Sequence, residues 1–242
     1  MKHPVALSAL LGALTLAPAQ AQVVRLGVPG APQLLQIEGE VANPEKLRLL
    51  AGLAEIRADL QLGLLFLQEK LPHPEGSHFA HARQTVLPGI AEGLAAAGVP
   101  DLAPLLQTLE AAKGKDAVRA AYNDVEAALL RARASLAPTS EEVLQSVVEM
   151  AREAAGKIDP SGTTPIRDYQ SAWATLMVAR GELDLLSRGL DRAIAKLAGE
   201  QAMAFDDVIL FMPDPHQLAP VAFDPDLIVD LVRKLEVGAK AV

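Results

Sequence analysis

Histidines are concentrated in one short stretch of this sequence, between His73 and His81, which contains three of the five histidines together with Glu75. The residues after Ser77 are typical of a helix with that serine as its N-cap. Such a helix carries His78 and His81 on one face, because residues three positions apart are neighbours on a helix surface. Imidazole is the commonest transition-metal ligand in proteins. We therefore predict a metal site formed by His78 and His81, with Glu75 or His73 assisting.

Nitrogen ligands combined with a carboxylate suit iron, copper or zinc better than calcium or magnesium. One short segment does not complete a coordination shell, so a second helix must contribute. The candidates lie in a later helical stretch: Tyr169 with Asp168, and Glu182 with Asp184. An alternative interpretation is structural, with both histidines of the helix packing one end of a bundle through hydrogen bonds. A pH-sensitive interface is a third, because histidine titrates at about pH 6.5.

The C-terminal part of the chain contains two further groups of ligand side chains. A set that suits copper consists of Met203, Met212 and His216. Methionine at helical spacing also fills gaps in a core, so packing is the simpler explanation. A cluster of acids consists of Asp214, Asp224 and Asp226, but it lacks the alternation and the glycine of a calcium loop. Asp224 is better explained as a helix N-cap.

Common active-site motifs are absent from the sequence. It contains no Gly-x-Ser-x-Gly elbow, no phosphate loop and no His-Glu-x-x-His zinc helix. There is no cysteine, which excludes disulfides and thiolate metal sites. The formal net charge is −8, without any basic block, which argues against nucleic acid or an anionic membrane surface as a partner. We therefore expect metal handling rather than catalysis.

The first 21 residues are typical of a secretory signal peptide. Lys2 gives a basic start, residues 5–17 form a short apolar run, and Ala19-Gln20-Ala21 is a cleavage site that favours a cut after Ala21. The apolar run is too short to span a bilayer, and no later segment resembles a membrane span. We expect a periplasmic or secreted protein whose partner is a metal transporter or another exported protein.

Most of the remaining chain shows apolar residues at helical spacing. Half of the sequence is apolar but only 3% is aromatic, so leucine, alanine and valine build the core. Residues 22–42 form an irregular lead that glycine and proline interrupt. Long helices are expected from Asn43-Pro44 to about residue 70 and over residues 166–197, and Thr139 or Ser140 caps another helix. Pro88 is expected to kink or break the helix that begins at Ser77.

These elements predict an all-α fold, because no stretch shows the alternation of a strand. The simplest architecture is an up-and-down helical bundle of about eight helices over residues 43–242. The similar patterns of residues 47–94 and 143–190 also allow two fused bundles, with halves 43–137 and 138–242.

The segment Gly76-Ser77-His78-Phe79-Ala80-His81 resembles the Gly-x-His-x-x-Glu motif of imelysin-like periplasmic proteins. That family consists of exported helical bundles linked to iron uptake. The resemblance covers one short motif and the helical character of the chain, and it implies that His78 is a metal ligand. The last position departs from the motif, so the resemblance implies that His81 replaces the carboxylate in the site.

The sequence thus predicts an exported helical bundle that binds a transition metal ion for uptake, buffering or delivery. The competing prediction is a metal-free helical scaffold that binds a protein or an apolar ligand along its apolar helices. A hydrolytic metalloenzyme would also need an open coordination position facing a pocket. The first two predictions differ in whether the two helical histidines converge with a further ligand.

Overall fold

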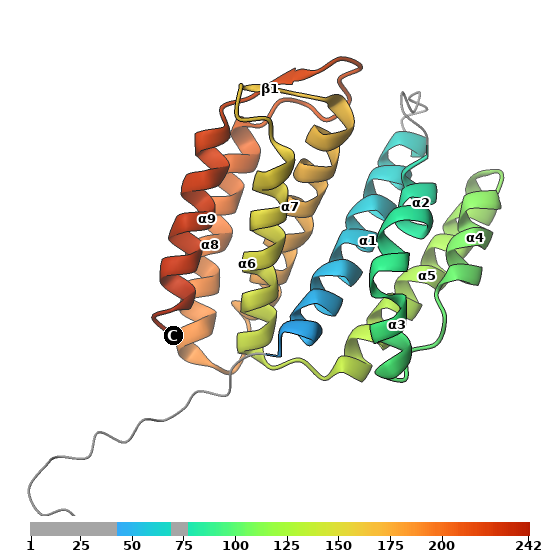
Figure 1. The fold of residues 1–242 in the computed structure, drawn as a ribbon, viewed down its shortest axis with the longest axis horizontal. Helices are drawn as coiled ribbons and strands as arrows, with labels where there is room; N and C mark the ends of the chain where they lie inside the picture. Colours follow the sequence, from blue (N-terminus) through green and yellow to red (C-terminus); the bar gives the residue numbers. More distant parts are fainter. Residues whose placement is uncertain (1–42, 69–76) are drawn as a thin grey trace, which may run out of the picture. The chain divides into compact units, whose positions relative to one another are not determined.

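The computed structural model describes residues 43–68 and 77–242 of the chain. The predicted signal peptide (1–21), the predicted lead (22–42) and the candidate ligands His73 and Glu75 lie outside the described residues. In chain order the elements are α1 (Pro44–Gln68), α2 (His78–His81), the π-helical segment η1 (Ala82–Val86), α3 (Leu87–Ala96), α4 (Ala103–Ala111), α5 (Lys115–Leu136), α6 (Ser140–Lys157), β1 (Thr163–Thr164), α7 (Ile166–Leu186), α8 (Arg192–Phe211), β2 (Val221–Ala222) and α9 (Pro225–Ala239) (Figure 1). The prediction of an all-α bundle is confirmed.

The helix that begins after Ser77 continues through Pro88, so that of the expected kink or break, the break does not occur. The elements α2, η1 and α3 follow one another without a gap, and the π-helical turn lies directly before the proline. Proline cannot donate the backbone hydrogen bond to the previous turn, and the π-helical turn shifts the bonding pattern at that point. Counted as one helix, this run and the other seven give eight helices in the described residues, in agreement with the expected number.

The single helix expected over residues 166–197 is two helices. The first of them, α7, ends at Leu186, and Asp191 caps the next one by accepting the backbone N–H groups of Ala193 and Ile194. Leu190, which lies in the turn between them, is fully exposed. The apolar spacing continues across the turn and therefore hides the break, whereas the N-cap aspartate signals it.

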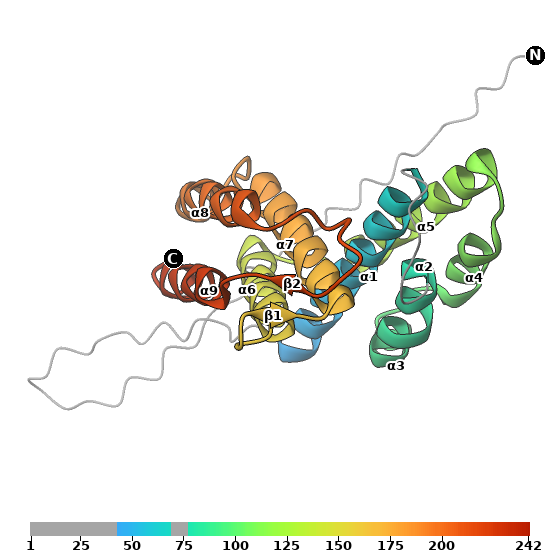
Figure 2. The ribbon, with the colours of Figure 1, turned by 90° about the horizontal axis from the view of Figure 1, so that it is seen from above.

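The central element is α1, which lies between two groups of helices (Figure 2). Its residues Ala58, Leu62 and Phe66 join a first core cluster with α6, α7, α8 and α9. Other α1 residues, including Ile56 and Leu60, join a second cluster with α2, η1, α3, α4 and α5. A helix that packs on two cores needs apolar side chains on more than one face, which explains the leucine-rich sequence of α1, above all in its C-terminal part. The division into halves 43–137 and 138–242 stays a prediction.

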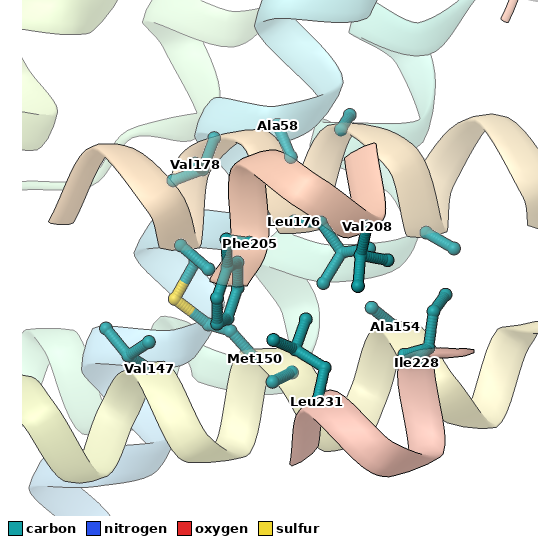
Figure 3. Packing of buried hydrophobic residues seen from close by; sticks show 14 of the residues in the cluster. Ala58, Val147, Met150, Ala154, Leu176, Val178, Phe205, Val208, Ile228 and Leu231 are labelled. Carbon is teal, nitrogen blue, oxygen red and sulfur yellow. The ribbon is translucent and has the colours of Figure 1, made fainter. Parts of the chain in front are cut away.

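In the first core cluster, side chains of α6, α7, α8 and α9 interdigitate with one another and with those of α1 (Figure 3). Met150 of α6 and Phe205 of α8 are almost completely buried there. Burial of such a side chain stabilises the fold by roughly 1.5–3 kcal/mol. At the start of α6, Thr139 and Glu142 form a reciprocal capping box, which confirms the predicted helix start. The helices of this group are therefore stabilised both by packing and at their ends.

A short sheet fixes the segment between α8 and α9. Strands β1 and β2 pair antiparallel, with Thr163 opposite Ala222. The first turn of α7 holds the same segment, because Tyr169 donates its hydroxyl to the carbonyl of Pro213 and Gln170 donates Nε2 to the carbonyl of Pro215 at 2.8 Å. Within residues 43–68 and 77–242, none of the helices has both the length and the hydrophobicity of a membrane span.

Candidate functional site

The two helical histidines lie in the first turn of the helix that follows Ser77. The serine occupies the N-cap position with an extended backbone, but its side chain makes no capping hydrogen bond. His78 is buried and His81 is half-buried. The start of this helix therefore places both imidazoles against α1.

Asp59 of α1 is the group that both imidazoles face. Nδ1 of His81 lies 2.6 Å from Oδ2 of Asp59, and Nδ1 of His78 lies 4.0 Å from Oδ1 of the same carboxylate. Asp59 is buried. The two histidines thus share one face of their helix, as predicted, and one carboxylate from another helix lies between them.

Burial raises the pKa of Asp59, and the His81 imidazole, Lys157 and Arg167 offset part of that rise. The ammonium of Lys157 is held in place by Glu55 at 3.0 Å and Glu153 at 2.6 Å. Burial lowers the pKa of Lys157, but the two glutamates outweigh this effect and raise it. A buried carboxylate needs positive or hydrogen-bonding neighbours, and this part of the protein provides both.

Phe66 connects His78 to a histidine from the far end of the chain. The Phe66 ring centroid lies 5.4 Å from that of His78 and 5.7 Å from that of His216, and both pairs of rings are tilted. Phe66 is fully buried. His216, which the sequence grouped with two methionines, therefore packs on the same phenylalanine as His78.

The second-helix ligands expected from the sequence have other partners. The Tyr169 hydroxyl donates to a backbone carbonyl. Glu182 pairs with Arg133, and Asp184 pairs with Arg188 at 2.6 Å. Asp168 lies in the first turn of α7. The carboxylate beside the histidines is instead Asp59, and a signal for it was available, because an aspartate within a helix that has apolar side chains on more than one face must find a partner.

The predicted copper set is not assembled. Met203 is 63% exposed on α8, whereas Met212 is buried in the first core cluster. Residues nine positions apart on a helix point to opposite sides. In the acidic group, Asp224 accepts the backbone N–H of Asp226 at 3.0 Å and caps α9, as expected.

No three His, Asp or Glu side chains of the described residues are already arranged to hold a metal ion. Asp59 and His81 are instead joined by a hydrogen bond. Glu75 and His73, which were expected to assist the site, lie outside the described residues. No protein-family model matches the chain, and neither a curated protein nor a solved structure matches it.

Proposed function

We propose that this protein binds a transition metal ion, iron, copper or zinc, through His78 and His81. The observation that supports this proposal is that Nδ1 of each histidine faces a different oxygen of the buried Asp59 carboxylate. Two nitrogens and one carboxylate from neighbouring helices are a donor set that suits these metals. Asp59 takes the place that the sequence prediction gave to a remote carboxylate.

The spacing of these donor atoms is close to that of ligands around one ion. Ligand atoms about 2.1 Å from a metal lie about 3.0–3.4 Å from each other in octahedral and tetrahedral sites. The two nitrogen–oxygen separations, 2.6 and 4.0 Å, lie on either side of that range. We therefore infer that small side-chain adjustments bring these donors to ligand spacing when an ion binds. The metal replaces the proton that His81 and Asp59 share.

The role that follows is capture, buffering or delivery of the metal rather than catalysis. Export to the periplasm or the medium, and a metal transporter or another exported protein as partner, belong to the same proposal. So does the resemblance of residues 76–81 to the imelysin-like motif, in which His78 is the ligand position. The assistance of Glu75 or His73 stays a prediction.

The test combines elemental analysis of the purified protein with thermal unfolding in the presence of iron, copper or zinc. A ligand at a hundred times its dissociation constant that binds only the native state adds about 2.7 kcal/mol of stability. We expect this stabilisation in the wild type and its loss in the double variant His78→Gln, His81→Gln. Asp184→Asn, which removes a carboxylate near the opposite end of α7, is the matched control. A wild type that neither holds nor responds to any of these metals overturns the proposal.

The alternative function, a metal-free scaffold for a protein or an apolar ligand, is favoured by one separate observation. A groove of about 760 Å³ lies between α1, η1, α3 and α6. Its lining combines an apolar floor that includes Leu47, Ala51, Val86 and Ile90 with charged side chains of α1 and α6: Arg48, Glu55, Glu149, Arg152 and Glu153. Its volume falls within the range of small-molecule sites. Stabilisation by an apolar ligand, lost in Ala51→Trp and unaffected by the double histidine variant, would support this function instead.

A further inference from the structure

His216 has one paired and one unpaired ring nitrogen. Nδ1 lies 2.6 Å from Oδ1 of Asp214. Nε2 is shielded from solvent, and no hydrogen-bond partner for it exists in the part of the chain that the structure describes. Buried polar atoms of folded proteins are nearly always paired, so an unpaired one indicates a group that binds there.

The Asp214 carboxylate decides which nitrogen carries the proton. This carboxylate is 62% exposed and also accepts the backbone N–H of His216 at 2.9 Å. An exposed aspartate is ionised at neutral pH and can only accept, so Nδ1 must donate to it. In this tautomer the lone pair of the ring is on Nε2. Metal-binding histidines show this same arrangement, in which the second nitrogen donates to a carboxylate.

The start of α7 fixes the position of the segment that carries His216. Gln170 holds the carbonyl of the preceding residue, Pro215, at 2.8 Å, and Tyr169 holds that of Pro213. The imidazole of His216 packs on Phe66, whose ring also contacts His78. A fully buried phenylalanine is thus the common neighbour of the two imidazoles.

We propose that Nε2 of His216 is a third imidazole ligand of the metal that binds at His78 and His81, with Asp214 as the residue that positions the ring. This inference rests on the proposed function and extends it to the segment between α8 and α9. The ion then takes ligands from α2 and from the segment between α8 and α9. Three imidazoles favour a borderline divalent ion, zinc or copper(II), over calcium or magnesium.

The experiment is nitrogen-15 NMR of the imidazole rings in the full chain, recorded without metal and with one equivalent of zinc. Without metal, His216 should show a protonated Nδ1 and an unprotonated Nε2. With zinc, Nε2 of His216 should shift at the same equivalence point as the signals of His78 and His81. We also expect His216→Gln to weaken zinc binding by at least tenfold and Asp214→Asn by about tenfold, because loss of an orienting carboxylate typically costs 10- to 100-fold. Asp184→Asn is the control.

The outcomes separate this inference from the proposed function. If zinc shifts only His78 and His81 and His216→Gln binds as the wild type does, the third ligand is refuted and the proposed function stands. If zinc shifts none of the three rings, the third ligand is refuted for zinc, and the proposed function is refuted as well when iron and copper also leave the thermal stability of the wild type unchanged. A folding defect in His216→Gln does not obscure the result, because the wild-type spectrum reports the ligation of His216 directly.

Discussion

Two His–Asp pairs of the candidate site have the same nitrogen–oxygen separation, 2.6 Å, and similarly exposed imidazoles, but their carboxylates differ sharply in burial. In the first pair the Asp59 side chain is only 3% exposed and the His81 side chain is 22% exposed. In the second, the Asp214 side chain is 62% exposed, while Nε2 of His216 is shielded from solvent. The first pair compensates a buried carboxylate, and the second orients an imidazole of which only Nε2 is shielded from solvent. Equal distances therefore do not imply equal roles.

The largest expected effect comes from removing Phe66, whose ring packs on both His78 and His216. Phe66→Ala should lower the free energy of unfolding by about 3–5 kcal/mol, because a completely buried phenylalanine is removed. The NMR signals of His78 and His216 should both change, since each ring packs on Phe66. Denaturant unfolding measures the loss, and Leu185→Ala at an exposed position is the control. A change confined to one histidine would show that the two groups are independent.

Removing the Asp59 or the Asp214 carboxylate from the metal-free protein should have different effects on stability. Asp59→Ala should destabilise by about 2–3 kcal/mol, because it leaves buried imidazoles without their charged partner. Asp214→Ala should cost less than about 1 kcal/mol, because water replaces an exposed carboxylate. Urea unfolding in the presence of a chelator measures both losses. Equal losses would contradict the assignment of different roles.

A smaller loss of stability is expected from changing Gln170, which holds the backbone next to His216 of the His216–Asp214 pair. Gln170→Leu should destabilise by about 1–2 kcal/mol, because it removes the donor to the carbonyl of Pro215. The imidazole signals of His216 should shift, and those of His81 should not. The matched control is Gln107→Leu at an exposed position of α4. Shifts of both histidines would show that the two pairs are coupled.

A small effect that depends on pH is expected at Glu142, a carboxylate whose partners include no histidine. Burial raises the pKa of Glu142, but the hydrogen bonds from Lys46 and Thr139 lower it by more than burial raises it. The pKa of Glu142 therefore lies below its usual value of 4.5. A carboxyl whose pKa is lower in the folded state stabilises the protein above its unfolded pKa, and this contribution disappears as the pH falls through the folded pKa. Glu142→Gln should therefore cost about 1 kcal/mol at pH 7 and progressively less below about pH 4.5. An unchanged difference at pH 3 would contradict this account.

Short-range patterns in the sequence determined the helices. Thr139 with Glu142 and Asp224 with Pro225 start helices where the sequence predicts them, and His78 and His81 share a face because they are three residues apart. These features depend on groups within about one helical turn, so a linear sequence contains the information. The break at Asp191 has a local cause too, but the continuing apolar spacing conceals it.

Only the tertiary structure decided which side chains meet. Asp59 and Phe66 lie about two turns apart on α1 and far from His216 in the chain, and each of the three was absent from the predicted histidine site. Helical periodicity places a residue on a face, but the element opposite that face depends on how all the helices pack together. The same packing buries Asp59 and leaves Asp214 in solvent. That difference in burial, which residue types and spacing do not encode locally, gives the two His–Asp pairs their different roles.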